Sequence, residues 1–304
     1  MKLQEDGRQL LSESSTVYGQ SEYIGIHALS EVVNSLLASG AASMGVEVRI
    51  TYPPRADKSL IYLMKKMIKK ECCKRGILLL KIQDFEIPLI CVPSATVNGI
   101  SMSSGQDARN LCTGHIYGDR KGRKGTIGED IVLSKWAGME GMLLAARERM
   151  DALTERFTPA FIRRILSYEK ELFAGRELEI AKDMGATALR QITQGGIFAA
   201  LWNLSKELGA GLELDMSRFS ILQETVEVCE YFRLNPYQLT SAGSFLLVAN
   251  DGEALSETLL REGIMASVIG RITDGQGKFI KNGEDVRCID RPAPDEIWKL
   301  FTEK

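Results

Sequence analysis

The sequence has few of the residues on which imidazole chemistry depends. It contains two histidines, His27 and His115, among 304 residues. A metal site with several imidazole ligands is therefore excluded, and a Ser–His–acid triad would have to use one of these two. His27 lies in an apolar stretch where we expect a packed helix, and His115 follows a glycine in an expected strand. Because no G-x-S-x-G segment accompanies them, the sequence does not favour a hydrolase.

Paired cysteines, long apolar runs and an excess of one charge are also missing. The six cysteines form no C-x-x-C spacing, so we expect reduced, mostly buried thiols and neither a zinc knuckle nor a redox pair. No apolar run reaches the ~18 residues of a membrane-spanning helix, and the polar, acidic N-terminus lacks the apolar core of a secretory signal. The net charge of −2 gives no indication of a nucleic acid or an anionic membrane as partner. We therefore expect a cytoplasmic protein.

What is present is an alternation of helical and strand-like periods in both halves of the chain. It predicts an α/β (α+β) fold, and the length suits two domains, expected at residues 1–160 and 161–304. Residues 1–22 show no clear period and are expected to be a loose lead-in. Helices are expected at 24–39, 60–72, 196–208, 221–232 and 252–263. Strands are expected at 46–53, 76–80 (short and buried), 87–100, 130–134, 244–250 and 265–273.

The stretch "QITQGGIFAALWNL" (191–204) is typical of a loop that holds an anion. Thr193 and the pair Gly195–Gly196 open a long apolar helix, where free backbone N–H groups gather. The polar positions around this turn are amides, however: Gln191, Gln194 and, two turns along, Asn203.

The second half resembles the C-terminal domain of the AIR synthase superfamily. That group includes aminoimidazole ribonucleotide synthase, the HypE-type hydrogenase maturation factor and selenophosphate synthetase. The resemblance is carried by "GATALRQITQGGIFAALWNLSKELGAGLELD", "ETVEVCEYFRLNPYQLTSAGSFLLVA" and "ASVIGRITDG". In the first half "ALSEVVNSLLASGA" and "DIVLSKWAGMEGMLLAARE" are similar to the AIR synthase-related and HypE-like members. The likeness covers roughly residues 24–300.

The resemblance implies a PurM-like fold of two α/β domains, with the N-terminal domains paired into a dimeric barrel of strands. It also implies Mg-ATP at the domain interface, used to activate an amide or acyl oxygen, or a selenide, by phosphoryl transfer. Such chemistry needs carboxylates, because Mg²⁺ prefers hard oxygen ligands beside the phosphates.

The departures from the family pattern fall on those carboxylates. Where the family has Asp-x-Thr-(Glu/Asp)-Gly-Gly, this chain has Gln191 and Gln194, and a common Glu is Asn203. The family's Val-Asn-Asp reads Val33-Asn34-Ser35. The family's glycine-rich N-terminal loop is missing, so the first domain is expected to be truncated at its start. Also missing are the glycine pair expected near Lys81 and the terminal cysteine motif of HypE. Because an amide cannot neutralise Mg²⁺, we expect weak or no Mg-ATP chemistry.

Two hypotheses follow. The favoured one is a homodimeric protein that binds a small molecule or a maturation partner without turnover. The alternative is an ATP-dependent enzyme of the HypE or AIR synthase type, with Glu22, Asp84 or Glu86 as substitute metal ligands. The resemblance assigns no catalytic or metal residue; the predicted ligand-binding residues are Asn34, Ser35, Lys135 (to a phosphate), Gln191, Thr193, Gln194, Gly195, Gly196 and Asn203.

Simpler interpretations stay open beside these. Asn203 could be plain surface, and the two glycines could serve only close helix packing. Four loop bases could meet phosphates, although we favour an exposed hairpin tip: Arg120, Lys121, Arg123 and Lys124. The homodimer is expected because helix 24–39 and strand 87–100 offer more apolar surface than a small domain hides alone.

Overall fold

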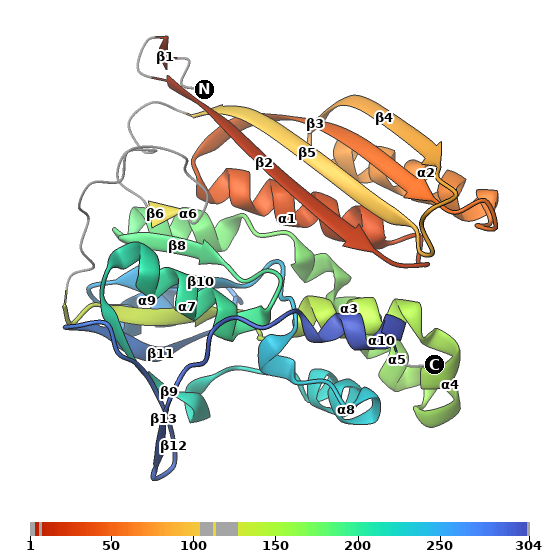
Figure 1. The fold of residues 1–304 in the computed structure, drawn as a ribbon. Helices are drawn as coiled ribbons and strands as arrows, with labels where there is room; N and C mark the ends of the chain where they lie inside the picture. Colours follow the sequence, from red (N-terminus) through yellow and green to blue (C-terminus); the bar gives the residue numbers. More distant parts are fainter. Residues whose placement is uncertain (1–3, 6–7, 104–111, 114–126, 303–304) are drawn as a thin grey trace.

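The structure is a computed structural model that describes residues 4–5, 8–103, 112–113 and 127–302. His115 and the four loop bases lie outside these residues. The chain forms two sheets with helices packed on them, as the predicted α/β class requires (Figure 1).

The first sheet has five strands in the order β1-β2-β5-β3-β4. Their bounds are Gln4–Glu5 (β1), Arg8–Tyr18 (β2), Ser94–Ser103 (β5), Ala41–Tyr52 (β3) and Leu78–Glu86 (β4). All neighbours are antiparallel except β3 and β4. β1 pairs only with Arg8 and Gln9, so the rest of β2 is an edge among the described strands.

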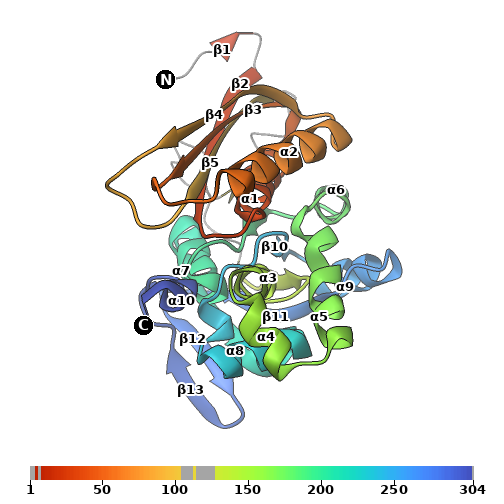
Figure 2. The same cartoon turned by 90° about the vertical axis from the view of Figure 1, so that its right-hand side faces the viewer.

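Two helices cover one face of this sheet, α1 (Ile24–Ala38) and α2 (Lys58–Lys74). Val46, Val48 and Ile50 alternate inward from β3 and pack in one core with both helices. α1 lies between the sheet and the second half of the molecule (Figures 1 and 2). It is therefore buried on nearly all sides, and Leu29 and Leu36 have no exposed surface.

The second sheet has eight strands in the order β13-β12-β9-β11-β7-β10-β8-β6. Their bounds are Asp285–Cys288 (β13), Lys278–Asn282 (β12), Gly211–Asp215 (β9), Ala266–Thr273 (β11), Asp130–Ser134 (β7), Phe245–Ala249 (β10), Ala188–Gln191 (β8) and Cys112–Thr113 (β6). β7 joins this sheet although it precedes the expected boundary at residue 160. That boundary stays a prediction.

Helices cover both faces of the second sheet. Ile131 and Leu133 of β7 pack with α7 (Gly196–Leu208), whereas Val132 packs with α6 (Arg176–Asp183) and α9 (Gly252–Arg261). Because both faces are buried, β10 is apolar throughout and β7 is apolar at residues 131–133, instead of alternating.

A third group of helices packs beside both layers. It consists of α3 (Met139–Glu148), α4 (Met150–Arg156), α5 (Pro159–Ser167), α8 (Gln223–Phe232) and the C-terminal α10 (Lys299–Thr302). Short 3-10 turns connect these elements at Tyr168–Leu172 (η2), Met216–Arg218 (η3), Pro236–Gln238 (η4) and Glu296–Trp298 (η5).

Three expectations from the sequence were wrong. The lead-in contains the long strand β2, whose hydroxyl-rich sequence conceals its period. Leu78 and Leu80 are exposed at 64% and 51%, because β4 is an edge strand and not a buried one. Among the five cysteines whose burial the structure describes, only Cys72 and Cys229 are buried.

Candidate functional site

A cavity of about 380 Å³ lies below the open edge of β2, and we name it the β2 pocket. Four segments build it: β2, α1, the loop before α7, and η5 near the C-terminus. Its lining residues are Glu13, Ser14, Ser15, Thr16, Tyr18, Glu31, Val32, Ser35, Thr193, Gln194 and Trp298. Residues from both halves of the chain therefore meet here, as expected for a site between two layers.

Two carboxylates face this cavity. Glu31 is only 7% exposed, and its Oε2 accepts a hydrogen bond of 2.5 Å from Ser15 Oγ. Burial raises the pKa of Glu31 well above its usual value; the charge of Glu140 adds to this, and the Ser15 hydrogen bond opposes it. Burial also raises the pKa of Glu13 to about 7. The pocket thus holds two acidic side chains, whereas positions 191, 194 and 35 have none, and burial favours the protonated forms of both acids.

An aromatic pair forms part of the wall. The rings of Tyr18 on β2 and Trp298 on η5 lie 5.3 Å apart, tilted by 60°. The contact joins β2 to the C-terminal segment, so the pocket depends on residues near both ends of the described chain.

The start of α7 is already occupied by a carboxylate of the chain itself. Gly195 N donates a 2.8 Å hydrogen bond to Asp295 Oδ2, and Ile297 N donates one of 3.0 Å to Oδ1. Asp295 is 4% exposed; its burial raises its pKa to about 6, although these hydrogen bonds work in the opposite direction. The N–H group that the motif offers to an anion therefore binds Asp295.

Both glycines of the motif are required by the backbone. Gly195 and Gly196 have φ values of 82° and 67°, a region that other residues rarely adopt. A Cβ on Gly196 would lie 2.5 Å from the carbonyl oxygen of Tyr237 in η4. The glycines thus serve the close packing that the sequence left open as one alternative.

The structure brings together some of the predicted ligand-binding residues. Ser35, Thr193 and Gln194 line the β2 pocket, and Ser35 Oγ donates to Gln191 Oε1 at 3.2 Å. Gln191 Nε2 is buried and has no hydrogen-bond partner among the described residues. Asn203 is half-buried in the third turn of α7 and does not line the pocket.

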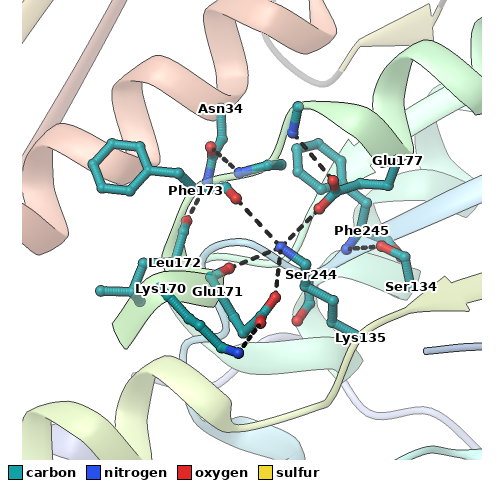
Figure 3. A network of polar contacts seen from close by, with 12 residues as sticks. Asn34, Ser134, Lys135, Lys170, Glu171, Leu172, Phe173, Glu177, Ser244 and Phe245 are labelled. Carbon is teal, nitrogen blue, oxygen red and sulfur yellow. Dashed lines mark hydrogen bonds and ion pairs between the residues drawn. The ribbon is translucent and has the colours of Figure 1, made fainter. Parts of the chain in front are cut away.

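Lys135 and Asn34 belong to a separate network (Figure 3). The Lys135 ammonium donates to the carbonyl oxygens of Glu171 (2.9 Å) and Phe173 (3.3 Å) and lies 2.8 Å from Glu177 Oε1. Asn34 donates to the Leu172 carbonyl and accepts from Ala174 N. Because these polar atoms are bonded within the protein, the geometry gives both side chains a structural task. We name this group the Lys135 network.

A buried His–Glu pair lies behind the pocket. His27 Nδ1 is 3.1 Å from Glu140 Oε1, and Glu140 Oε2 accepts hydrogen bonds from Thr240 Oγ1 and Ala242 N. Burial lowers the pKa of His27 to about 4 and raises the pKa of Glu140 to about 7. The packed helix histidine that we expected is thus neutral near pH 7.

The suggested substitute acids lie elsewhere. Asp84 and Glu86 are on β4, at the far edge of the sheet from β2, and pair with Lys65 (2.6 Å) and Lys58 (3.7 Å). Glu22 precedes α1 and is not among the residues that line the pocket. Sequence reasoning missed Glu13 and Glu31. Glu31 had a usable signal, because it lies one helical turn before Ser35 on the same face of α1.

Within the described ranges, no three His, Cys, Asp or Glu side chains converge as a metal site would require. Nor is any helix in this part of the chain long and apolar enough to cross a membrane.

The sequence matches the family described as AIR synthase related protein, C-terminal domain, over residues 126–282, just over half of the chain. It is 30% identical to carbamoyl dehydratase HypE of Rhodobacter capsulatus over 128 residues, 40% of this chain and 38% of that protein. It is 29% identical to phosphoribosylformylglycinamidine synthase subunit PurL of Ignicoccus hospitalis over 117 residues, 38% of this chain and 15% of that protein. The matches thus span less than two-fifths of each curated relative.

Solved structures share the fold over nearly the whole chain. HypE of E. coli, a hydrogenase maturation protein, has a TM-score of 0.70 at 15% identity and covers 96% of this chain and 88% of its own. A HypE–HypF complex gives 0.68 at 17% identity, with 94% and 90% covered. Thiamine monophosphate kinase from Aquifex aeolicus gives 0.65 at 16% identity, with 90% and 88% covered. These similarities confirm the predicted PurM-like fold.

Proposed function

The chain belongs to the family of AIR synthase related proteins, and from that premise we propose that it binds a small molecule in the β2 pocket without Mg-ATP chemistry. The resemblance to HypE indicates its ancestry. The replacement of family acids by Gln191, Gln194 and Ser35 is the reason that we propose binding without turnover. The whole-protein activities of its relatives remain proposals for this chain.

The observation that carries the proposal is the hydrogen bond from Gly195 N to Asp295. A phosphate at the start of α7 would have to displace a carboxylate that also caps η5 through Ile297 N. Two anions cannot share one helix N-terminus without strong repulsion. The chain therefore supplies from its own sequence the anion that this loop is shaped to bind.

The charge of the pocket supports the same conclusion. Its described lining includes two carboxylates and no Lys, Arg or His. A triphosphate entering this space would meet no basic side chain among the described residues, and any ionised carboxylate there would repel it.

The alternative function is an ATP-dependent enzyme with relocated metal ligands, and Glu13 and Glu31 are the observation that favours it. Mg²⁺ in nucleotide sites is often held by only one or two carboxylates together with the phosphates. Glu13 and Glu31, and not the expected Asp84 and Glu86, would then be the metal ligands.

One experiment separates the two functions. About 5 mM Mg-ATP should leave the melting temperature unchanged if the protein does not bind it. A ligand that does bind, at a hundredfold excess over Kd, would add about 2.7 kcal/mol to stability and raise the melting temperature. ATP with a chelator is the control. A rise of several degrees that needs the metal would establish the alternative, and Glu13→Gln together with Glu31→Gln should then abolish it.

A second arm tests the amides. Gln191→Asp with Gln194→Glu returns carboxylates to the family positions next to the pocket, and Asn203→Glu, outside the pocket, serves as a matched change. Mg-ATP should raise the melting temperature of the double variant more than that of Asn203→Glu. Equal responses would show that the amides are not what prevents binding.

We also propose that the protein is a homodimer, through the strand part of the expected surface and not through the helix. The apolar face of α1 is covered within the chain. The outer face of the first sheet instead exposes Leu10, Ile100 and Met102 at 40–46%. Pairing of this face in a second copy would cover it, as in the barrel that the resemblance implies.

Light scattering at micromolar concentration tests the dimer. Ile100→Glu should yield a monomer, since it puts a charge in the centre of the proposed interface. Leu89→Glu is the control, because Leu89 is 93% exposed in the turn before β5. A wild-type monomer would overturn the proposal. HypF, seen with HypE in one structural relative, indicates the kind of maturation partner to test next.

A further inference from the structure

We propose that the ligand of the β2 pocket is an organic cation, a protonated amine or guanidinium on a small apolar skeleton, held between Glu13 and Glu31 and the Tyr18–Trp298 wall. The proposal rests on the proposed function, because it names the class of molecule that the same site takes.

The first support is an uncompensated pair of acids. Glu31 is 93% buried; Ser15 bonds its Oε2, and no described residue bonds its Oε1. The Glu13 side chain has neither a hydrogen bond nor an ion pair within the described part of the chain. An ionised carboxylate is costly to bury without a partner, so burial favours the protonated form of both acids, and a positive group from outside would allow them to ionise.

The second support is the aromatic wall. Tyr18 and Trp298 border the same cavity as the two acids. Aromatic faces attract cations, Trp most strongly, and a ring also covers the apolar part of a small ligand. Hydroxyls of Thr16 and Thr193 and the Gln194 amide oxygen add acceptors for the remaining N–H groups. Carboxylates, acceptors and rings together match an N–H-bearing organic cation.

Protonation should be linked to this binding. Burial raises the pKa of Glu13 and of Glu31, and the charges of Glu140 on α3 and Asp295 before η5 raise that of Glu31 further. A bound cation favours the ionised carboxylates and so releases protons. Affinity should therefore increase from pH 6 to pH 8, while the probe itself stays protonated.

The test uses three probes of one skeleton: benzylamine, benzyl alcohol and benzoate. Calorimetry and ligand-observed NMR at pH 7.5 should show saturable binding of benzylamine, with benzyl alcohol at least about tenfold weaker and benzoate not binding. Phenethylamine and benzamidine extend the cationic arm. Failure of all three cations to bind, or equal binding of benzyl alcohol, would overturn the proposal.

Variants place the binding in the pocket. Glu31→Gln keeps the shape and the Ser15 contact and should weaken benzylamine about tenfold or more; Glu13→Gln should weaken it less, because Glu13 is less buried. Glu47→Gln makes the same chemical change on an exposed residue of β3 and should have no effect. If Glu31→Gln and Glu47→Gln behave alike, the cation binds elsewhere and the proposal is wrong.

Two further outcomes separate this proposal from the one on which it rests. If MgCl₂ or MnCl₂ alone competes with benzylamine at millimolar concentration, the acids are a metal site and the organic cation is not the ligand. A metal-dependent melting shift with ATP would overturn the proposed function itself. Benzylamine binding with no ATP shift supports both.

Discussion

Asn34 and Ser35 are neighbours on α1, yet they belong to two regions that treat charge in opposite ways. Asn34 takes part in the Lys135 network, where a buried cation is surrounded by two carbonyl oxygens and two carboxylates. Ser35 lines the β2 pocket, where two carboxylates face a cavity without a cation among the described lining residues. A network closed within the chain serves the fold. An open one offers the binding energy of its unpaired groups to a ligand.

The largest expected effect comes from breaking the closed network. Lys135→Met keeps the length of the side chain but leaves Glu177 buried at 3% exposure without its cation. The free energy of unfolding should fall by about 3–5 kcal/mol, measured by chemical denaturation. Lys58→Met removes an exposed pair 3.7 Å from Glu86 and should cost less than ~1 kcal/mol. Similar losses in both variants would mean that the Lys135 network is no stronger than a surface pair.

The loop between the two regions should tolerate little change, because Gly195 and Gly196 are both buried. In Gly196→Ala, both the positive φ and the contact with the Tyr237 carbonyl oppose the methyl group, so we expect a loss of at least about 2 kcal/mol. Gly185→Ala is the matched control, with a φ of 77° and nothing within 4 Å of the added Cβ. It should lose only about 1 kcal/mol. If both lose the same amount, packing against η4 contributes nothing.

The pocket acids should give stability an unusual dependence on pH. Burial raises the pKa of Glu13 and Glu140 to about 7 and that of Glu31 well above its usual value, so the folded state keeps protons that the unfolded state has lost. The free energy of unfolding should therefore fall as pH rises through this range. His27, with its pKa lowered to about 4, opposes the trend only below about pH 6.5.

Denaturation at pH 6.5 and pH 8 measures this dependence. We expect a fall on the order of 1 kcal/mol in the wild type. Glu31→Gln should make this fall in stability smaller. Glu47→Gln is the reference variant and should show the same fall as the wild type. A stability that increases between these pH values would contradict the raised pKa values of the buried pocket acids.

The smallest effect is expected for charges that belong to neither region. Changing Arg120, Lys121, Arg123 and Lys124 to Ser should alter stability by less than ~1 kcal/mol, since isolated surface charges contribute little. These residues lie outside the described ranges, so the exposed tip stays a prediction. A large drop in melting temperature would show that they are paired inside the fold.

The sequence predicted the core elements better than the site, for a physical reason. Helix 196–208 was predicted with its observed bounds, because its apolar stripe and Gly209 mark burial and termination directly. β2 was missed because its inward side chains include Glu13 and Ser15, which face a cavity and leave no apolar period. A strand that builds a polar pocket loses the signal by which strands are recognised.

The partner of the glycine loop could not be predicted either. Asp295 lies a hundred residues from Gly195 in the sequence, and local patterns carry no information about so distant a contact. Nor could the amides alone show that two other acids, Glu13 and Glu31, line the pocket. Residue identity at family positions predicted a loss of charge, whereas the fold determines where charge lies.

The Tyr18–Trp298 contact has a consequence for the order of folding. It joins residues separated by almost the whole described chain, and such long-range contacts are the slowest to form because the loop they close is long. The pocket should thus be completed after the folding barrier has been crossed. A bound ligand would then slow unfolding and leave the folding rate unchanged. The molecule that fills the pocket would therefore increase the kinetic stability of the native protein.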